Sequence, residues 1–149
     1  MLFCSGYVAP ERPRPRSTIH DLPASLFWKE IERLNGTPDA VLRNPELMKL
    51  VEPALRADFA ACETYVYRDE APLDCPIAAF RGIDDPNTNV EGIGAWQRQT
   101  EAGFSTSVFA GDHFFIVSER SRVLAAIRRE MRTQLGLVLP EMLGESVAA

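Results

Sequence analysis

The chain has 149 residues, of which 46% are hydrophobic, and its formal net charge at pH 7 is −5. This length and composition suffice for one buried core. The acidic balance, with no basic stripe, disfavours nucleic acid as a partner. No apolar run approaches the roughly 18 residues that span a membrane, and no positively charged segment precedes the apolar first residues, as a signal peptide requires. A cytoplasmic protein is expected.

The cysteines and histidines are few and widely spaced. The chain has three cysteines, Cys4, Cys62 and Cys75, and two histidines. An odd number of cysteines without a Cys-x-x-Cys pair argues against a disulfide framework and favours reduced side chains. Two histidines are too few for a multi-histidine metal site, so neither a metal nor a cofactor is expected. Arg12, Arg14 and Arg16 alternate with prolines, which indicates an extended connector rather than a phosphate-binding patch.

The first half of the chain is predicted to be mostly helical. Residues 2–4 resemble the tail of a buried strand, and the proline-rich residues 8–23 are predicted to form a loop. From residue 24 to 34 the apolar residues recur at helical spacing, and Asn35-Gly36 ends that helix. Further helical pieces are predicted after Pro38, after Pro45, and at Pro53, which is suited to the first position of a helix. No strand is predicted between Ser5 and about Tyr65.

The second half alternates between strand and helix patterns. The predicted elements are a strand at 77–80 closed by Gly82, a weak helix at 92–100, a strand at 104–109, an amphipathic helix at 118–135 and a frayed tail at 140–149. Strands separated by helices form βαβ units with a parallel sheet. The sequence therefore predicts an α/β fold with a helical insertion between its first two strands.

Residue types suited to acid–base catalysis follow two of these strands. Asp84 and Asp85 come after the strand at 77–80, and His113 comes after the strand at 104–109. In an open parallel sheet, functional side chains gather beyond the carboxyl ends of the strands. A serine hydrolase needs a histidine to take the serine proton and a carboxylate to orient that histidine. On spacing alone, an Asp-Asp-Pro turn is more often an ordinary loop or helix cap, and a histidine beside two phenylalanines is more often structural.

Many short motifs also resemble those of type II thioesterases, the stand-alone editing hydrolases of non-ribosomal peptide and polyketide synthesis. They are Leu22-Pro23, Gly36-Thr37-Pro38, Asn44-Pro45-Glu46-Leu47-Met48, Pro53-Ala54-Leu55-Arg56-Ala57-Asp58-Phe59, Glu63-Thr64-Tyr65, Leu73-Asp74-Cys75-Pro76, Gly82-Ile83-Asp84-Asp85-Pro86, Trp96, Thr100 and Gly111-Asp112-His113-Phe114-Phe115. The resemblance covers nearly all of residues 2–135. It implies an α/β-hydrolase fold, of which this chain would be the C-terminal portion.

The resemblance also implies roles for individual residues. The catalytic acid of the family is the fourth residue of a Gly-x-x-Asp turn, which is Asp85, and the catalytic base would be His113. Asp112 departs from the family's Gly-Gly-His-Phe pattern. Residues 22–66 would form a helical lid subdomain within a partial thioesterase domain covering 1–149. The implied partner is an acyl or peptidyl carrier protein that holds an acyl thioester on its phosphopantetheine arm.

The nucleophile of such an enzyme is missing from this sequence. No Gly-x-Ser-x-Gly elbow occurs, and the family carries it before the segment that matches here. Ser5 lacks that context, and nothing identifies Cys4 as a low-pKa thiol. The expected function is therefore a thioesterase fragment that supplies Asp85 and His113, is inactive alone and needs an N-terminal half in trans. The alternative is a non-catalytic remnant that binds carrier proteins or acyl chains.

Overall fold

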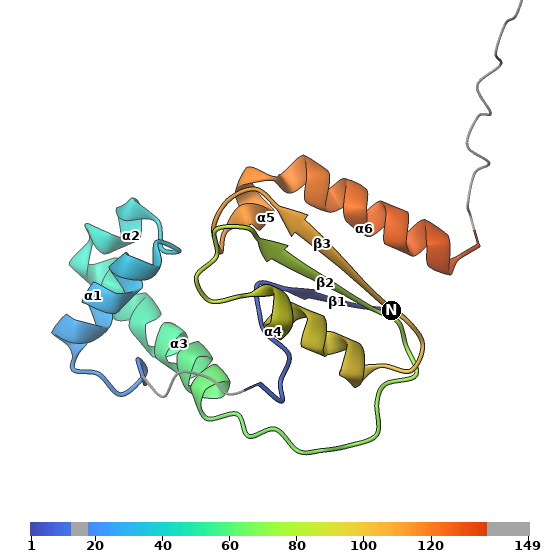
Figure 1. The fold of residues 1–149 in the computed structure, drawn as a ribbon. Helices are drawn as coiled ribbons and strands as arrows, with labels where there is room; N and C mark the ends of the chain where they lie inside the picture. Colours follow the sequence, from blue (N-terminus) through green and yellow to red (C-terminus); the bar gives the residue numbers. More distant parts are fainter. Residues whose placement is uncertain (13–17, 137–149) are drawn as a thin grey trace, which may run out of the picture. The chain divides into compact units, whose positions relative to one another are not determined.

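The computed structural model describes residues 1–12 and 18–136, which form two compact units (Figure 1). One unit contains Met1–Pro10 and the chain from Glu70 onward, and the other contains Glu11–Asp69. The connector predicted around Arg14 and Arg16 and the tail predicted at 140–149 lie outside the described residues.

The first unit is built on a three-stranded parallel sheet in the order β1-β2-β3. The strands are β1 (Leu2–Ser5), β2 (Ile77–Gly82) and β3 (Phe104–Phe109). Ile77 of β2 lies opposite Leu2 of β1 and Phe104 of β3, so all three strands run in register and in one direction. The predicted parallel sheet is confirmed. Its carboxyl ends bring Gly6, Gly82 and Ala110 to one edge.

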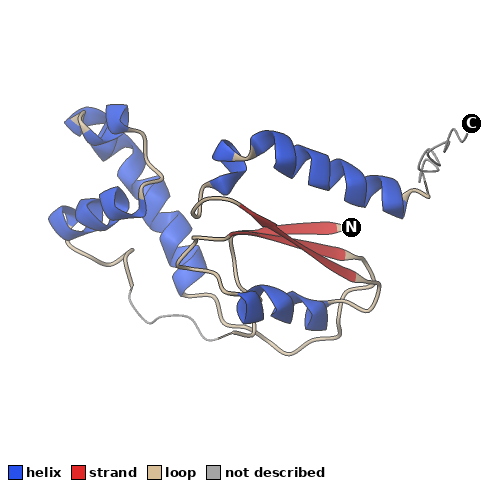
Figure 2. Ribbon diagram, turned by 45° about the horizontal axis from the view of Figure 1, so that its top comes forward, coloured by secondary structure: helices blue, strands red, loops and turns tan. Residues whose placement is uncertain are grey.

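Helices cover both faces of this sheet (Figure 2). One face carries α4 (Val90–Gly94) and the 3₁₀-helix η1 (Ala95–Gln99), which together occupy the predicted weak helix. The other face carries α6 (Arg120–Gln134), which is the amphipathic helix predicted at 118–135, and the short α5 (Phe115–Ser118), which was not predicted. The chain bends at Glu119 between α5 and α6. The result is a three-layer α/β arrangement.

An aromatic core joins the sheet to α5 and α6. Phe109 stacks on Phe115 with ring centroids 5.3 Å apart, and Phe80 meets Phe109 edge-on at 5.6 Å. Val123 and Ala126 of α6 complete this buried cluster. Burying each phenylalanine stabilises the fold by about 2–3 kcal/mol. Because Phe115 follows the β3 loop directly, its burial anchors the segment that contains His113.

The second unit consists of α1 (Ala24–Leu34), α2 (Asp39–Leu42) and α3 (Pro45–Glu63). Phe27 and Ile31 form the buried stripe of α1, as the spacing predicts, and Asn35 closes the helix with a left-handed φ of 57°. Phe59 of α3 meets the Phe27 ring edge-on at 6.3 Å. Aromatic packing between α1 and α3 therefore forms the small core of this unit.

The prediction that Pro53 begins a helix is wrong. The side chain of Asn44 caps α3, Pro45 occupies its first turn, and Pro53 lies inside the helix. An interior proline costs a backbone hydrogen bond. Residues on both sides of Pro53 contact α1. The Trp28 indole donates a hydrogen bond to Glu52, and the Arg56 guanidinium lies 4.1 Å from the Phe27 ring centroid. This tertiary packing explains why α3 continues through Pro53.

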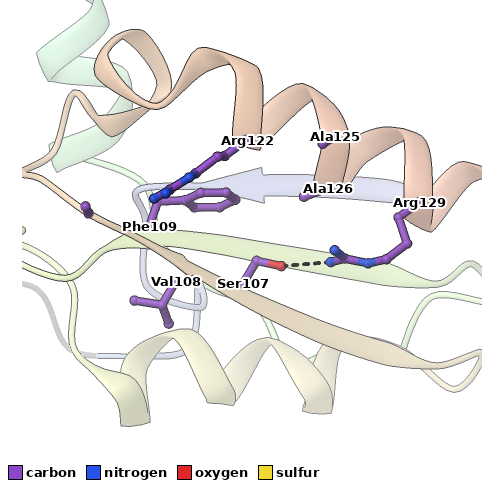
Figure 3. A pocket seen from close by; sticks show the side chains of 8 residues that line it. Ser107, Val108, Phe109, Arg122, Ala125, Ala126 and Arg129 are labelled. Carbon is purple, nitrogen blue, oxygen red and sulfur yellow. Dashed lines mark hydrogen bonds between the residues drawn. The ribbon is translucent and has the colours of Figure 1, made fainter.

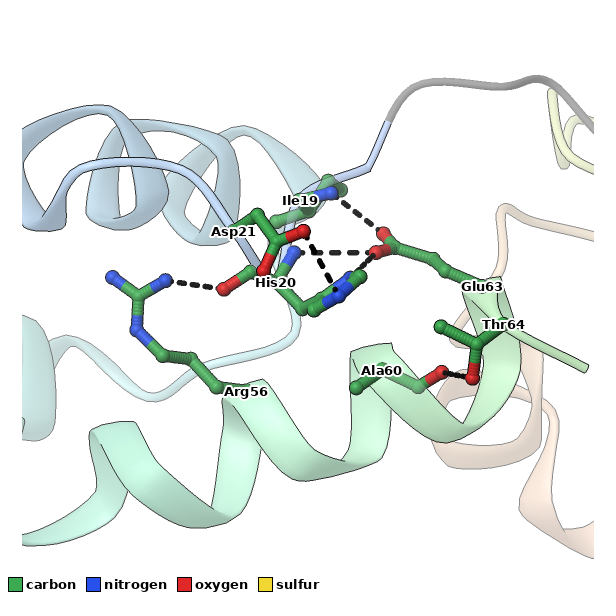
Figure 4. A network of polar contacts seen from close by, with 7 residues as sticks. All are labelled: Ile19, His20, Asp21, Arg56, Ala60, Glu63 and Thr64. Atoms are coloured by element: carbon green, nitrogen blue, oxygen red, sulfur yellow. Dashed lines mark hydrogen bonds and ion pairs between the residues drawn. The ribbon is translucent and has the colours of Figure 1, made fainter.

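A polar network fastens the segment before α1 to the end of α3 (Figure 4). The Glu63 carboxylate accepts hydrogen bonds from the backbone N–H of Ile19 at 2.8 Å and from the ring Nδ1 of His20 at 2.5 Å. The other ring nitrogen of His20 lies 3.2 Å from the Asp21 carboxylate. Arg56 donates to the His20 carbonyl oxygen. Charged side chains from α3 thus hold the entry to α1.

Replacing Glu63 by glutamine is expected to make this unit less stable at neutral pH. Burial would raise the pKa of Glu63, but hydrogen bonds from the His20 ring and from the backbone N–H groups of Ile19 and His20 hold that pKa below its ordinary value of 4.5. A lowered folded-state pKa means that the carboxylate stabilises the fold above the unfolded-state pKa. This contribution is lost as the pH falls through the folded-state pKa.

Denaturant unfolding at pH 7 and at pH 3 measures this effect. The free energy of unfolding of Glu63→Gln should fall below that of wild type at pH 7, and the difference should be smaller at pH 3, where more of the Glu63 side chain is protonated in the folded state. Glu32→Gln, on the exposed face of α1, is the matched control and should follow wild type at both values. Equal loss of stability at both pH values would contradict the assigned role of the Glu63 charge.

Candidate active site

The loop after β2 presents two carboxylates in different environments. The N–H of Ile83 donates to the Phe109 carbonyl at 2.8 Å, and the N–H of Asp84 donates to the Gly111 carbonyl at 3.0 Å. These bonds continue the β2–β3 pairing beyond the strands. Asp85 is buried, with only 4% of the residue exposed, whereas Asp84 is exposed to solvent. Only Asp85 therefore points into the protein.

Asp85 meets His113 at the carboxyl edge of the sheet. Nδ1 of His113 lies 2.9 Å from Oδ2 of Asp85, as a hydrogen bond from the ring to the carboxylate. The other carboxylate oxygen, Oδ1, accepts from the backbone N–H of Asn87 at 2.9 Å. The His113 side chain remains 38% exposed, while that of Asp85 is completely covered. The geometry thus brings together the two side chains that the sequence singled out, and it separates Asp85 from Asp84.

Gly6, which directly follows β1, lies close to the imidazole of His113. Gly6 has a φ of +65°, and a Cβ added there would lie 3.1 Å from Cε1 of His113. Its N–H donates to the Phe80 carbonyl, which keeps β1 paired to β2 up to this point. A side chain at Gly6 would press on the ring and strain the backbone. The sequence analysis did not single out Gly6, because a lone glycine after a short strand does not show which side chain will lie against it.

The arrangement suits proton transfer by the imidazole. A histidine whose Nδ1–H is held by a buried carboxylate presents Nε2 as the proton acceptor and is stabilised once it becomes positively charged. No hydrogen bond from the rest of the described chain occupies Nε2. Phe114 lies edge-on to the ring, with centroids 5.3 Å apart. The site can therefore act as a general base, but it needs a nucleophile to activate.

Neither nearby residue of β1 has the properties of that nucleophile. Ser5 ends the strand without an elbow turn. Burial, with a smaller effect from Cys75, raises the pKa of the Cys4 thiol to about 11. At neutral pH Cys4 is therefore protonated and unreactive.

Alkylation kinetics should show this low reactivity of Cys4. At pH 8 we expect iodoacetamide to modify Cys4 at least tenfold more slowly than Cys62, because a raised pKa leaves little thiolate and because Cys62 is exposed. Mass spectrometry of peptides after timed quenching measures both rates in the same sample. Modification of Cys4 as fast as that of Cys62 would contradict the assignment of Cys4 as a partly buried, protonated thiol.

Arg81 of β2 holds the loop that carries Asp85. Its guanidinium donates to the Thr88 carbonyl at 3.0 Å and to the Ile83 carbonyl at 3.4 Å. These carbonyls lie on opposite sides of Asp85 in the chain, so one side chain ties both ends of the loop together. Sequence reasoning missed Arg81, because a charged residue near the end of a buried strand gives no sign of which carbonyls it binds.

Replacing Arg81 by methionine is expected to lower the free energy of unfolding by about 1.5 kcal/mol, the scale of hydrogen bonds from a charged donor. Loosening the loop should also weaken the bond between Asp85 and His113. Thermal unfolding measures the first effect, and NMR of the His113 ring nitrogens measures the second. Arg81→Lys retains the charge but not the forked geometry, so an intermediate effect is expected. If Arg81→Met had the stability and the His113 spectrum of wild type, the role of Arg81 in holding the loop around Asp85 would be refuted.

In residues 1–12 and 18–136, no group of three or more His, Cys, Asp or Glu side chains could hold a metal ion. Over the same described residues, none of the helices combines the length and the apolar character that crossing a membrane requires.

Comparison with known proteins identifies the family. The family model of the thioesterase domain matches residues 1–131. Gramicidin S biosynthesis protein GrsT from Aneurinibacillus migulanus is 38% identical over 134 residues, which cover 90% of this chain and 52% of that protein. The chain thus spans about half the length of this relative.

Solved structures agree with the sequence match. The type II thioesterase BorB from the borrelidin biosynthetic cluster superposes with a TM-score of 0.78 at 37% identity, covering 88% of this chain and 54% of BorB. ClbQ from the colibactin NRPS/PKS pathway superposes with a TM-score of 0.83 at 33% identity, covering 92% of this chain and 58% of ClbQ. The sheet and helices are those of an α/β-hydrolase fold, and the chain belongs to the thioesterase domain family, among the type II thioesterases of non-ribosomal peptide and polyketide pathways.

Proposed function

We propose that this chain supplies the acid and the base of a Ser-His-Asp triad in a carrier-protein thioesterase. The observation that carries the proposal is the 2.9 Å contact between Nδ1 of His113 and the buried carboxylate of Asp85. In this role Asp85 fixes the imidazole tautomer and stabilises its protonated form. Nε2 of His113 is then free to exchange protons with the nucleophile.

The reaction has two steps. In the first, His113 takes the proton of a serine hydroxyl as its oxygen attacks the thioester carbonyl, and the protonated imidazole then gives this proton to the departing thiolate. An acyl-serine ester and a free thiol result. In the second, His113 takes a proton from water, which attacks the ester, and then returns the proton to the serine oxygen. The products are a carboxylic acid and the regenerated enzyme.

The serine is proposed to lie on a Gly-x-Ser-x-Gly elbow outside these 149 residues. The chain contains no such motif and covers 52% of its relative GrsT. Ser5 lacks the elbow turn, and the thiol of Cys4 is protonated at neutral pH. An N-terminal half, in the same polypeptide or in trans, would add the serine and the oxyanion-hole N–H groups. Without that half, these residues are expected to be inactive.

The substrate is proposed to be an acyl or peptidyl thioester on the phosphopantetheine arm of a carrier protein. The support comes from relatives: GrsT is named for gramicidin S biosynthesis, and ClbQ for a mixed NRPS/PKS pathway. Residues 22–66, which lie within the helical unit Glu11–Asp69, are proposed as the lid over the acyl chain. Such editing would take place in the cytoplasm, and the proposed steps call for no cofactor.

Hydrolysis of an acetyl-loaded peptidyl carrier domain tests the proposal. The chain is assayed alone, together with an N-terminal thioesterase segment that bears the serine elbow, and together with the same segment carrying serine replaced by alanine. Hydrolysis only with the intact serine segment is the expected result. Carrier binding without hydrolysis in any mixture would favour the alternative, a non-catalytic binding remnant.

A further inference from the structure

An open groove runs between α6 and the edge strand β3 (Figure 3). Its volume is about 480 Å³. The walls and floor combine small and apolar residues with two arginines. The lining residues are Ser107, Val108, Phe109, Ala110, Arg122, Ala125, Ala126 and Arg129. Within the described residues β3 pairs with β2 alone, so this side of β3 is open.

The helix α6, which forms one wall of the groove, carries a net positive charge, although the chain as a whole is negatively charged. α6 and its preceding residue Glu119 contain five arginines and two glutamates, whereas the whole chain has a net charge of −5. All five arginines, Arg120, Arg122, Arg128, Arg129 and Arg132, are exposed. The local charge is therefore opposite to the overall charge, and this surface would attract an acidic partner that the rest of the chain repels.

The two groove arginines are available to such a partner. The side chain of Arg122 is 75% exposed, and among the described residues it pairs with Glu119 alone, three residues earlier on the same surface. The side chain of Arg129 is 63% exposed, and its contacts with Ser107 and Glu130 are both long, at 3.4 Å. Exposed pairs of this kind contribute at most about 1 kcal/mol. Carboxylates from a partner can replace them at little cost.

The spacing of the arginines defines what fits between them. Arg122 and Arg129 are seven residues apart in α6, which corresponds to about 10 Å along the helix axis. The exposed Ala125 and the buried Ala126 leave the space between them open. A complementary surface would place one apolar side chain over these alanines and a carboxylate near each guanidinium.

The groove lies near the proposed catalytic base. Ala110 lines the groove and precedes His113 by three residues, a span of at most about 11 Å. A protein held in the groove would therefore stand next to the carboxyl edge of the sheet, where a flexible arm could reach His113.

We propose that the groove between α6 and β3 is a docking surface for the acidic face of the carrier protein, with Arg122 and Arg129 as its charged contacts. This inference rests on the proposed function, because that function requires a carrier protein near His113. The charge of the whole chain disfavours an acidic partner, so recognition depends on this local basic surface.

Titration of the chain with an excised holo peptidyl carrier domain of acidic net charge tests the docking surface. Binding is followed by isothermal calorimetry and by NMR line broadening at 50 mM and 300 mM salt. We expect Arg122→Glu combined with Arg129→Glu to raise the dissociation constant at least tenfold. A wild-type complex should weaken with salt, whereas the variant should show little further weakening.

Two further variants separate docking from general electrostatics and from misfolding. Arg120→Glu combined with Arg128→Glu makes the same change in net charge on α6, but neither residue lines the groove; its dissociation constant should change less than threefold. Ala125→Trp fills the groove without changing the charge and should also weaken binding at least tenfold. Circular dichroism verifies that each variant is folded.

The binding experiment distinguishes a failure of the proposed docking surface from a failure of the proposed catalytic function. Binding that is equally weakened by both charge-reversal pairs, or unaffected by Arg122→Glu with Arg129→Glu and by Ala125→Trp, would overturn the docking surface. The binding assay uses a carrier without an acyl group, so it does not depend on hydrolysis. If the protein binds as expected but never hydrolyses a thioester, the docking surface stands and the catalytic proposal fails.

Discussion

Replacing His113 by alanine is expected to reduce kcat for thioester hydrolysis about 10⁵-fold in the protein supplied with its serine segment. The loss is large because one side chain performs every proton transfer in both steps. KM should change little, because the lining of the acyl site remains. Single-turnover hydrolysis of an acyl-loaded carrier domain, followed by mass spectrometry, measures the effect directly.

The two neighbouring aspartates provide the matched comparison. Asp85→Asn should lower kcat about 10⁴-fold, since the amide no longer holds the required imidazole tautomer. Asp84→Asn should stay within about threefold of wild type, because Asp84 is exposed while Asp85 makes the bond to His113. If Asp84→Asn were the more damaging substitution, or if His113→Ala retained wild-type turnover, the assignment of the catalytic pair would be refuted.

Replacing Gly82 by alanine is expected to lower the free energy of unfolding by about 3 kcal/mol, the upper end of typical costs for inserting a methyl group into a packed site. A Cβ at Gly82 would lie 2.2 Å from the backbone carbonyl oxygen of Asp112 and 2.5 Å from that of Gly111. Backbone cannot swing aside as a side chain can. The loop that carries His113 must therefore shift away from Asp85.

Thermal and denaturant unfolding measure the stability loss, and an NMR spectrum of the His113 ring reports the displaced loop. Gly94→Ala is the control, since no atom lies within 4 Å of a Cβ at that position. A helical alanine at Gly94 should be neutral or stabilise by up to about 1 kcal/mol. If Gly82→Ala and Gly94→Ala were equally stable, Gly82 at the end of β2 could not lie as close to the loop after β3 as the structure shows.

The parallel sheet and the pairing of Asp85 with His113 follow from local sequence signals. Apolar runs at 77–80 and 104–109 each end in a polar turn, and parallel strands bring such turns to one edge. This reasoning gave the neighbourhood of the site and, with the family resemblance, the choice of Asp85 over Asp84. The structure adds a physical basis for that choice, which is burial of one carboxylate and exposure of the other.

Contacts between distant segments were beyond local reasoning. Pro53 had the sequence features of a helix start, but packing of α3 against α1 on both sides of it continues the helix. Gly6 approaches His113 closely although the two are more than 100 positions apart in the chain, and Arg81 binds carbonyls whose positions depend on the path of a loop. Such interactions depend on the assembled backbone, which a one-dimensional pattern does not encode.

The central claim is that Asp85 holds His113 with its Nδ1 protonated and its Nε2 free, and ring-nitrogen NMR tests it most directly. Histidine labelled with ¹⁵N reports the tautomer, and the proton on Nδ1 reports its hydrogen bond. In the wild-type chain at neutral pH, we predict an Nδ1–H resonance shifted downfield by the Asp85 carboxylate and protected from exchange with water, and we predict that Asp85→Asn removes it. An imidazole that exchanges freely between tautomers in wild type, or a resonance unchanged in Asp85→Asn, would contradict the account.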